Sequence, residues 1–194
     1  MADARIELAP QFDDLEQQEQ TATLGMWTFL STEVLFFGGL ILSYTVYRIT
    51  YPGAWAAGSL HTNLLLGTLN TAVLLTSSLT VALALGAAKL GDNKIAFRYL
   101  AATLFLGLVF LALKGLEYSQ HIHEGLWPGP NYDPDLPAKT QLFFYHYWVM
   151  TGLHAIHVII GLGVVSVMML LCARNRFTPA NHNALEVTGL YWHF

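Results

Sequence analysis

Long apolar stretches alternate with short polar ones from residue 24 onward. A helix that crosses the hydrocarbon core of a bilayer needs about 20 predominantly apolar residues. Stretches of that length cover residues 24–47, 64–88, 97–117 and 142–172. A fifth apolar stretch, residues 185–194, is too short to cross. The pattern predicts an all-α, polytopic membrane helix bundle with four complete transmembrane helices and the start of a fifth.

The composition supports this prediction. Hydrophobic residues make up 54% of the chain and charged residues only 11%, whereas soluble domains carry about 25% charged residues. Residues 1–23 are acidic and polar, and they lack the basic and apolar regions of a signal peptide. We therefore expect an acidic, cytoplasmic N-terminal segment ahead of a transmembrane bundle over residues 24–194. The polar connections are too short for a soluble catalytic domain.

Lysine and arginine indicate the orientation, because cytoplasmic loops of membrane proteins carry an excess of both. Most of them fall on one side of the predicted spans, which places the N-terminus in the cytoplasm. The loop of residues 119–140 is then extracytoplasmic. The cations on the cytoplasmic side are Arg5, Lys89, Lys94, Arg98, Arg174 and Arg176.

Glu33 is an acid inside the first predicted span. Its helical neighbours three and four residues away are phenylalanines and a leucine. An ionised acid at the centre of a span costs about 2.5–3.5 kcal/mol, so we expect the neutral form. Three interpretations remain open. Glu33 pairs with another helix of this chain, through Asn70 or a histidine of the fourth span; it faces a water-filled path; or it meets a partner subunit.

Histidine and methionine share one face of the fourth predicted span. His146, Met150, His154 and His157 follow each other at helical spacing. Such a face is compatible with copper or haem ligation. Haem ligands come from opposite sides of the ring, however, and no other predicted span carries a well-buried histidine. Hydrogen bonds to other helices, to lipid headgroups or to Glu33 are the simpler interpretation.

Other polar residues have local explanations. Asn70 lies on a small-residue stripe of the second span and needs a hydrogen-bond partner on a neighbouring helix. Lys114 and Glu117 are three residues apart and can pair on one helix face.

The acidic residue Glu186 opens the last apolar stretch. It follows Asn181 and Asn183, a pattern that favours an asparagine cap and an acid at a helix start. His182 lies four residues before Glu186 and can contact it.

Five motifs in this order together resemble subunit III of haem–copper terminal oxidases. They are "STEVLFF", "LNTAVLLTSS", "GLEY", "TGLHAIHVIIG" and "NALEVTGLYWHF". The resemblance covers nearly everything from Thr23 to Phe194. It is closest to the short, five-helix bacterial form of cytochrome c oxidase subunit III, which lacks the first two helices of the seven-helix version.

The resemblance implies a non-catalytic subunit of a proton-pumping oxidase in aerobic respiratory electron transport. Such a subunit lies in the bacterial cytoplasmic membrane, binds subunits I and II and structural phospholipid, stabilises subunit I, and supports proton uptake and oxygen access. It implies no haem, copper or other metal in this chain, because these cofactors belong to partner subunits, and no catalytic residue. Membership of a larger respiratory supercomplex stays open, and no nucleic-acid partner is expected.

The resemblance also assigns residues. Glu33 matches the family's carbodiimide-reactive carboxylate, and His154 and His157 match its paired histidines. Glu117 and Glu186 match glutamates of the third and last helices. The expected structural or lipid-cleft polar groups are therefore Asn70, Glu117, His154, His157 and Glu186.

Alternatives remain at this point. Subunit III of a quinol oxidase and an accessory protein of nitric-oxide reduction are related candidates, although a glutamate at position 33 favours cytochrome c oxidases by family analogy. A stand-alone haem- or copper-binding membrane protein is a candidate of another class. Family members continue beyond the position of Phe194, so we expect a truncated sequence.

Overall fold

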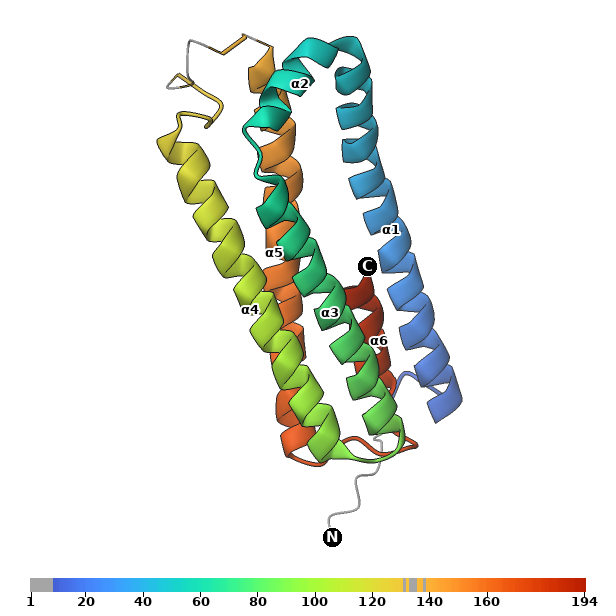
Figure 1. Ribbon diagram of the computed structural model, residues 1–194. Coiled ribbons are helices and arrows are strands. Elements are labelled where there is room, and N and C mark those ends of the chain that lie inside the picture. Colours follow the sequence, from blue (N-terminus) through green and yellow to red (C-terminus); the bar gives the residue numbers. More distant parts are fainter. Residues whose placement is uncertain (1–8, 131, 133–135, 138) are drawn as a thin grey trace. The chain divides into compact units, whose positions relative to one another are not determined.

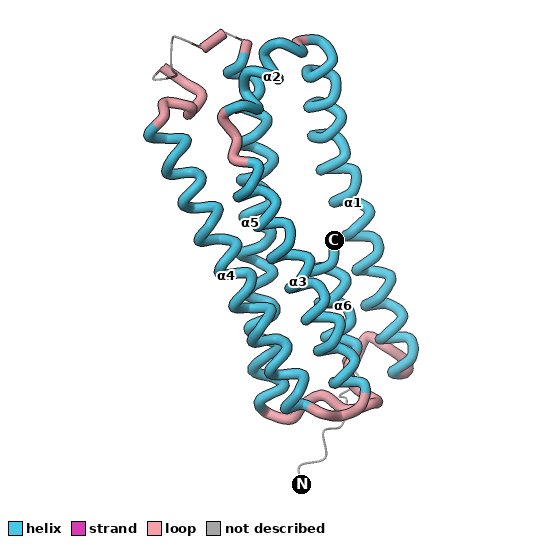
Figure 2. The backbone as a smooth tube through the Cα atoms, viewed as in Figure 1, coloured by secondary structure: helices cyan, strands magenta, loops and turns pink. Residues whose placement is uncertain are grey.

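The computed structural model describes residues 9–130, 132, 136–137 and 139–194. Within these residues the chain forms six α-helices joined by turns and loops, and no strand (Figures 1 and 2). Part of the predicted N-terminal segment, including Arg5, lies outside the described residues.

Four of the helices are long and apolar enough to span a membrane. This confirms the predicted fold class, with a shorter helix at the end. The long helices are α1 (Leu15–Thr50), α3 (Leu64–Lys89), α4 (Asn93–His123) and α5 (Thr140–Ala173), and the last helix is α6 (Asn183–His193).

The long helices extend beyond the apolar stretches that predict them. α1 begins at Leu15, inside the acidic N-terminal segment, because residues 15–23 are rich in good helix formers such as glutamate, glutamine and alanine. α4 continues to His123, past the predicted end of its span at residue 117. Hydropathy indicates which residues suit the hydrocarbon core, whereas the helix itself ends where its backbone hydrogen bonds end.

The short helix α2 (Pro52–Leu60) was not predicted. Proline occupies its first turn, where the missing backbone N–H would have had no partner in the helix. Trp55 points inward and is only 4% exposed. A Cβ atom at Gly58 would lie 2.5 Å from the Phe143 ring, so the close approach of α2 to α5 requires a glycine there.

The chain divides into two compact units, and the boundaries fall inside the four long helices. Unit 1 contains the described residues up to Thr32, together with residues 75–107 and 158–194. Its core is built largely from alanine and aliphatic side chains. The core residues are Ala84, Ala87, Ala88, Ala96, Leu100, Val165, Cys172, Phe177 and Leu185.

Trp192 fixes α6 within unit 1. Its indole Nε1–H donates to Ser77 Oγ of α3 at 2.8 Å. A Cβ atom at Gly107 would lie 3.1 Å from the indole, and one at Gly161 would lie 3.0 Å from it. The indole therefore rests against two positions at which α4 and α5 carry no side chain.

Unit 2 contains residues 33–74 and 108–157. Its core is aromatic and is formed by Trp55, Leu126, Phe143 and Phe144. The rings of Phe143 and Phe144 meet edge to face, with centroids 5.2 Å apart. Unit 2 also holds most of the polar residues that the sequence singled out.

Candidate functional site

Glu33 of α1 lies against His157 of α5 in unit 2. Glu33 Oε2 and His157 Nε2 are 3.1 Å apart, and the two side chains are 15% and 27% exposed. The Phe37 ring packs edge-on against the imidazole, with centroids 5.3 Å apart. The partner of Glu33 is thus a histidine of the fourth span, one of the two partners on this chain that the sequence left open.

The backbone of α5 determines which nitrogen of His157 carries a fixed proton. Nδ1 lies 2.8 Å from the carbonyl oxygen of Leu153, and because that oxygen can only accept, Nδ1 is protonated. In a neutral His157, Nε2 then presents a lone pair to Glu33. An ionised Glu33 beside it would place two lone pairs 3.1 Å apart. The contact is therefore attractive when one proton lies between the two atoms, on the carboxyl oxygen or on Nε2.

His146 is engaged in a similar way nearer the other end of unit 2. Its Nδ1–H donates to the carbonyl oxygen of Leu142 at 2.8 Å, and Ser43 Oγ lies 2.9 Å from Nε2. In the neutral ring the hydroxyl of Ser43 is therefore the donor. The Tyr47 ring packs against the imidazole at 5.1 Å between centroids.

His154 and Met150 do not join these contacts into one site. His154 is exposed and packs edge-on against Phe110, with ring centroids 5.7 Å apart. The part of the chain that the structure describes holds no group of three or more histidine, cysteine, aspartate or glutamate side chains arranged for a metal ion. The histidine face of α5 therefore divides among separate partners.

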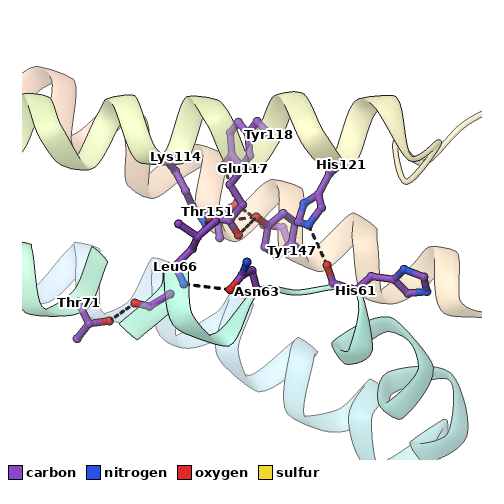
Figure 3. Close-up of polar contacts among 11 residues, drawn as sticks. His61, Asn63, Leu66, Thr71, Lys114, Glu117, Tyr118, His121, Tyr147 and Thr151 are labelled. Atoms are coloured by element: carbon purple, nitrogen blue, oxygen red, sulfur yellow. Dashed lines mark hydrogen bonds and ion pairs between the residues drawn. The ribbon is translucent and has the colours of Figure 1, made fainter. Parts of the chain in front are cut away.

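Glu117 lies at the centre of a buried polar cluster between α4 and α5 (Figure 3). Lys114 Nζ lies 2.9 Å from Glu117 Oε2, which confirms the predicted pair. Tyr147 donates its hydroxyl proton to Glu117 Oε1 at 2.6 Å, and Lys114 Nζ also donates to Tyr147 Oη at 3.3 Å. The side chains of Lys114 and Glu117 are only 14% and 6% exposed. Both carboxylate oxygens are satisfied, as a charge at such depth requires.

Hydrogen bonds extend this cluster on both sides (Figure 3). Thr151 donates to the carbonyl oxygen of Tyr147 at 2.6 Å. Because that uses its only hydrogen, Tyr118 is the donor in the 2.7 Å contact with Thr151 Oγ1. His121 Nε2–H donates to the carbonyl oxygen of His61 at 3.2 Å. Sequence reasoning missed Tyr147, because it lies 30 residues from Glu117 and no local spacing links them.

Asn70 is buried in unit 2, as the second span predicts, and is 5% exposed. Its Oδ1 accepts no hydrogen bond from the described residues. Glu33 makes its contact with His157 instead. The structure therefore brings Glu33 and His157 together and leaves Asn70 outside that contact.

Glu186 lies in unit 1, on the first turn of α6. Its carboxylate is 3.4 Å from Lys89 Nζ and 3.7 Å from His182 Nε2. The predicted asparagine cap is wrong, because His182 occupies the cap position and its side chain makes no capping hydrogen bond. Asn181 is held in a tight turn by backbone hydrogen bonds with Thr178, at 2.9 and 3.2 Å, and Asn183 is already the first helical residue.

Four apolar helices and the buried pair of Lys114 and Glu117 define a polytopic integral membrane protein whose interior carries polar groups. The family described as "Cytochrome c oxidase subunit III" matches residues 13–194. This chain belongs to the cytochrome c oxidase subunit III family, which confirms the resemblance. As a member it is an integral membrane subunit of a respiratory oxidase and associates with other oxidase subunits.

The relatives with this name come from several different organisms. Cytochrome c oxidase subunit 3 of Corynebacterium diphtheriae is 30% identical over 188 residues, covering 96% of this chain and 87% of the relative. A probable cytochrome c oxidase subunit 3 of Nocardia farcinica is 33% identical, covering 89% and 80%. The Gadus morhua subunit is 32% identical over 88% of this chain and 62% of its own length.

Proposed function

We propose that this chain is a non-catalytic subunit of a proton-pumping terminal oxidase that takes its electrons from cytochrome c. In this proposal it binds subunits I and II in a bacterial cytoplasmic membrane, with its N-terminus in the cytoplasm, and the haem and copper belong to those partners. The names of the relatives support cytochrome c rather than quinol as the donor.

Within this role, Glu33 and His157 form a neutral, one-proton contact that supports proton uptake and structural lipid without taking part in oxygen chemistry. The observation that carries this proposal is the 3.1 Å contact between them, together with the bond that fixes His157 Nδ1 to Leu153. Glu117, His154, Glu186 and Asn70 act as structural or lipid-facing polar groups in the same proposal.

Glu33→Gln in the assembled oxidase tests this role. The amide can still hydrogen-bond to His157 Nε2 but cannot exchange a proton, so we expect initial turnover to stay near that of the parent. We expect activity to decline sooner over sustained turnover, or bound lipid to decrease. Glu124→Gln, which changes an exposed carboxylate of unit 2 that has no part in this proposal, is the matched control. Immediate loss of turnover in a fully assembled Glu33→Gln complex would contradict the proposal.

Separation of the purified complex tests the assignment of cofactors. We expect haem absorbance and bound copper to remain with the partner subunits after this chain is removed. We also expect His154→Ala combined with His157→Ala to weaken assembly or lipid retention and to leave the haem spectrum unchanged. Metal or haem that stays with the isolated chain would instead support the stand-alone alternative.

A further inference from the structure

Phe37 of α1 touches the imidazole that Glu33 contacts. It lies four residues after Glu33, and residues at that spacing share one face of a helix. Its ring meets the His157 ring edge to face, with centroids 5.3 Å apart and an angle of 68° between the planes. Glu33 and Phe37 therefore approach one imidazole from the same helix, Glu33 at Nε2 and Phe37 at the ring.

The orientation of the His157 ring decides whether the contact with Glu33 exists. The hydrogen bond from Nδ1–H to the carbonyl oxygen of Leu153, 2.8 Å long, holds one edge of the ring. A single hydrogen bond leaves the ring free to tilt, and the edge-to-face contact with Phe37 opposes this tilt. Glu33 Oε2 has almost no surface open to solvent and lies 3.1 Å from Nε2. A tilt of the imidazole would lengthen this distance and uncover the oxygen.

The same arrangement recurs on α1 and α5 about three helical turns away. His146 also binds, through Nδ1, the carbonyl oxygen four residues before it. Ser43 of α1 lies 2.9 Å from its Nε2. Tyr47, four residues after Ser43, packs against its ring at 5.1 Å between centroids. Each of these two histidines is thus held at Nδ1 by its own helix, and at Nε2 and the ring by two residues of α1.

The two arrangements differ in the polar residue and agree in the aromatic one. Ser43 offers Nε2 a hydroxyl group, whereas Glu33 offers a carboxyl group that can gain or lose a proton. An aromatic side chain follows both at the same spacing, so its presence does not depend on the acid. The aromatic ring therefore serves the histidine, and the polar residue determines the chemistry of the contact.

We propose that Phe37 is a positioning residue for the contact between Glu33 and His157, and that it keeps His157 Nε2 directed at Glu33 Oε2. Phe37 carries no proton itself and acts only through the imidazole. This inference rests on the proposed function for its biological meaning, because the same contact is proposed to support proton uptake. Its test measures the geometry of the contact and not turnover, so the two proposals can fail separately.

The test is the rate at which a hydrophobic carbodiimide modifies Glu33 in the assembled oxidase, followed by mass spectrometry of this chain. Carbodiimides react with protonated carboxyl groups, and in the parent Oε2 is sealed from solvent beside His157. Phe37→Leu keeps an apolar side chain and removes the ring. We expect it to raise the rate about two- to tenfold, the range that corresponds to one edge-to-face aromatic pair. Phe37→Tyr supplies the residue found in the second arrangement, as Tyr47, and should react at the parent rate.

Tyr47→Leu is the matched control, because it removes the equivalent ring from His146 on the same two helices. It should leave the rate at Glu33 unchanged. An equal rise at Glu33 in Tyr47→Leu, or a rise at Glu117 in Phe37→Leu, would show general loosening of unit 2 and overturn the proposal. An unchanged or lower rate in Phe37→Leu would overturn it too, as would an equal rise in Phe37→Tyr.

Two further measurements keep the test decisive. If Phe37→Leu does not assemble, Phe37→Met, which also lacks a ring, carries the same expectation. Sustained turnover of the same variants is recorded in parallel. A raised rate of modification at Glu33 with unchanged sustained turnover would support the positioning role of Phe37 and contradict the proposed function of the contact.

Discussion

The two units of this chain manage charge in opposite ways. Unit 2 buries a charged pair within its spans, in which Glu117 is bound by Lys114 and Tyr147. Unit 1 packs alanine and aliphatic side chains in its core and keeps its charges exposed, as with Lys89 and Glu186. The same long helices run through both units, so the difference comes from side chains and not from secondary structure.

The comparison predicts its largest effect at Glu117. Glu117→Ala leaves the Lys114 ammonium buried without its carboxylate, and breaking a buried pair in this way costs about 3–5 kcal/mol. Glu186→Ala should cost only about 0–1 kcal/mol, because that carboxylate pairs at the surface. Thermal unfolding of the purified complex, and the amount of this chain that stays bound in it, measure the effects of both substitutions. Equal effects of the two changes would break the contrast between the units.

A somewhat smaller effect is expected for Tyr147→Phe. The change removes one hydrogen bond to the Glu117 carboxylate and leaves Lys114 in place. Hydrogen bonds to charged groups contribute about 1.5–3 kcal/mol. The same unfolding assay should therefore place this variant between Glu117→Ala and the parent. A loss of stability as large as that of Glu117→Ala would mean that the hydrogen bond from the Tyr147 phenol, and not the Lys114 ammonium, supplies most of the stability of the cluster.

Gly58→Ala tests the packing of unit 2 apart from its charges. The new Cβ would lie 2.5 Å from the Phe143 ring, and such overpacking costs about 1–3 kcal/mol. Gly53→Ala is the matched control, because it lies on the same helix and has nothing within 4 Å of an added Cβ. Equal stability of the two variants would show that α2 moves away from α5 without penalty.

The smallest effect is expected for Ser43→Ala. It removes the donor to His146 Nε2 and leaves the bond from Nδ1 to Leu142 intact. An ordinary hydrogen bond contributes about 0.5–1.5 kcal/mol. The same unfolding assay measures the loss. A loss of unfolding free energy above that range would indicate that His146 carries a charge, which would make this contact resemble that of Glu33 with His157.

Hydropathy was sufficient to predict the four spans and the fifth, shorter helix, because bilayer thickness sets their length. It missed α2, which is too short to show a clear pattern and depends on Gly58 packing against Phe143. Helical spacing was sufficient for Lys114 and Glu117, which belong to the same helix. Partners on other helices, such as Tyr147 for Glu117, depend on tertiary packing, so the sequence could at best offer alternatives. The predicted asparagine cap was wrong because a local turn with Thr178 holds Asn181 outside the cap position, which His182 occupies.

Trp192 has a consequence for the order in which the chain matures. One indole hydrogen-bonds to Ser77 of α3 and rests where Gly107 and Gly161 leave room on α4 and α5. These three positions are far apart in the sequence. The surface against which the indole packs therefore exists only once all three helices have been inserted and have come together. Docking of α6 is therefore a late event in biogenesis. A fluorescent readout of Trp192 would report that insertion of the preceding helices is complete.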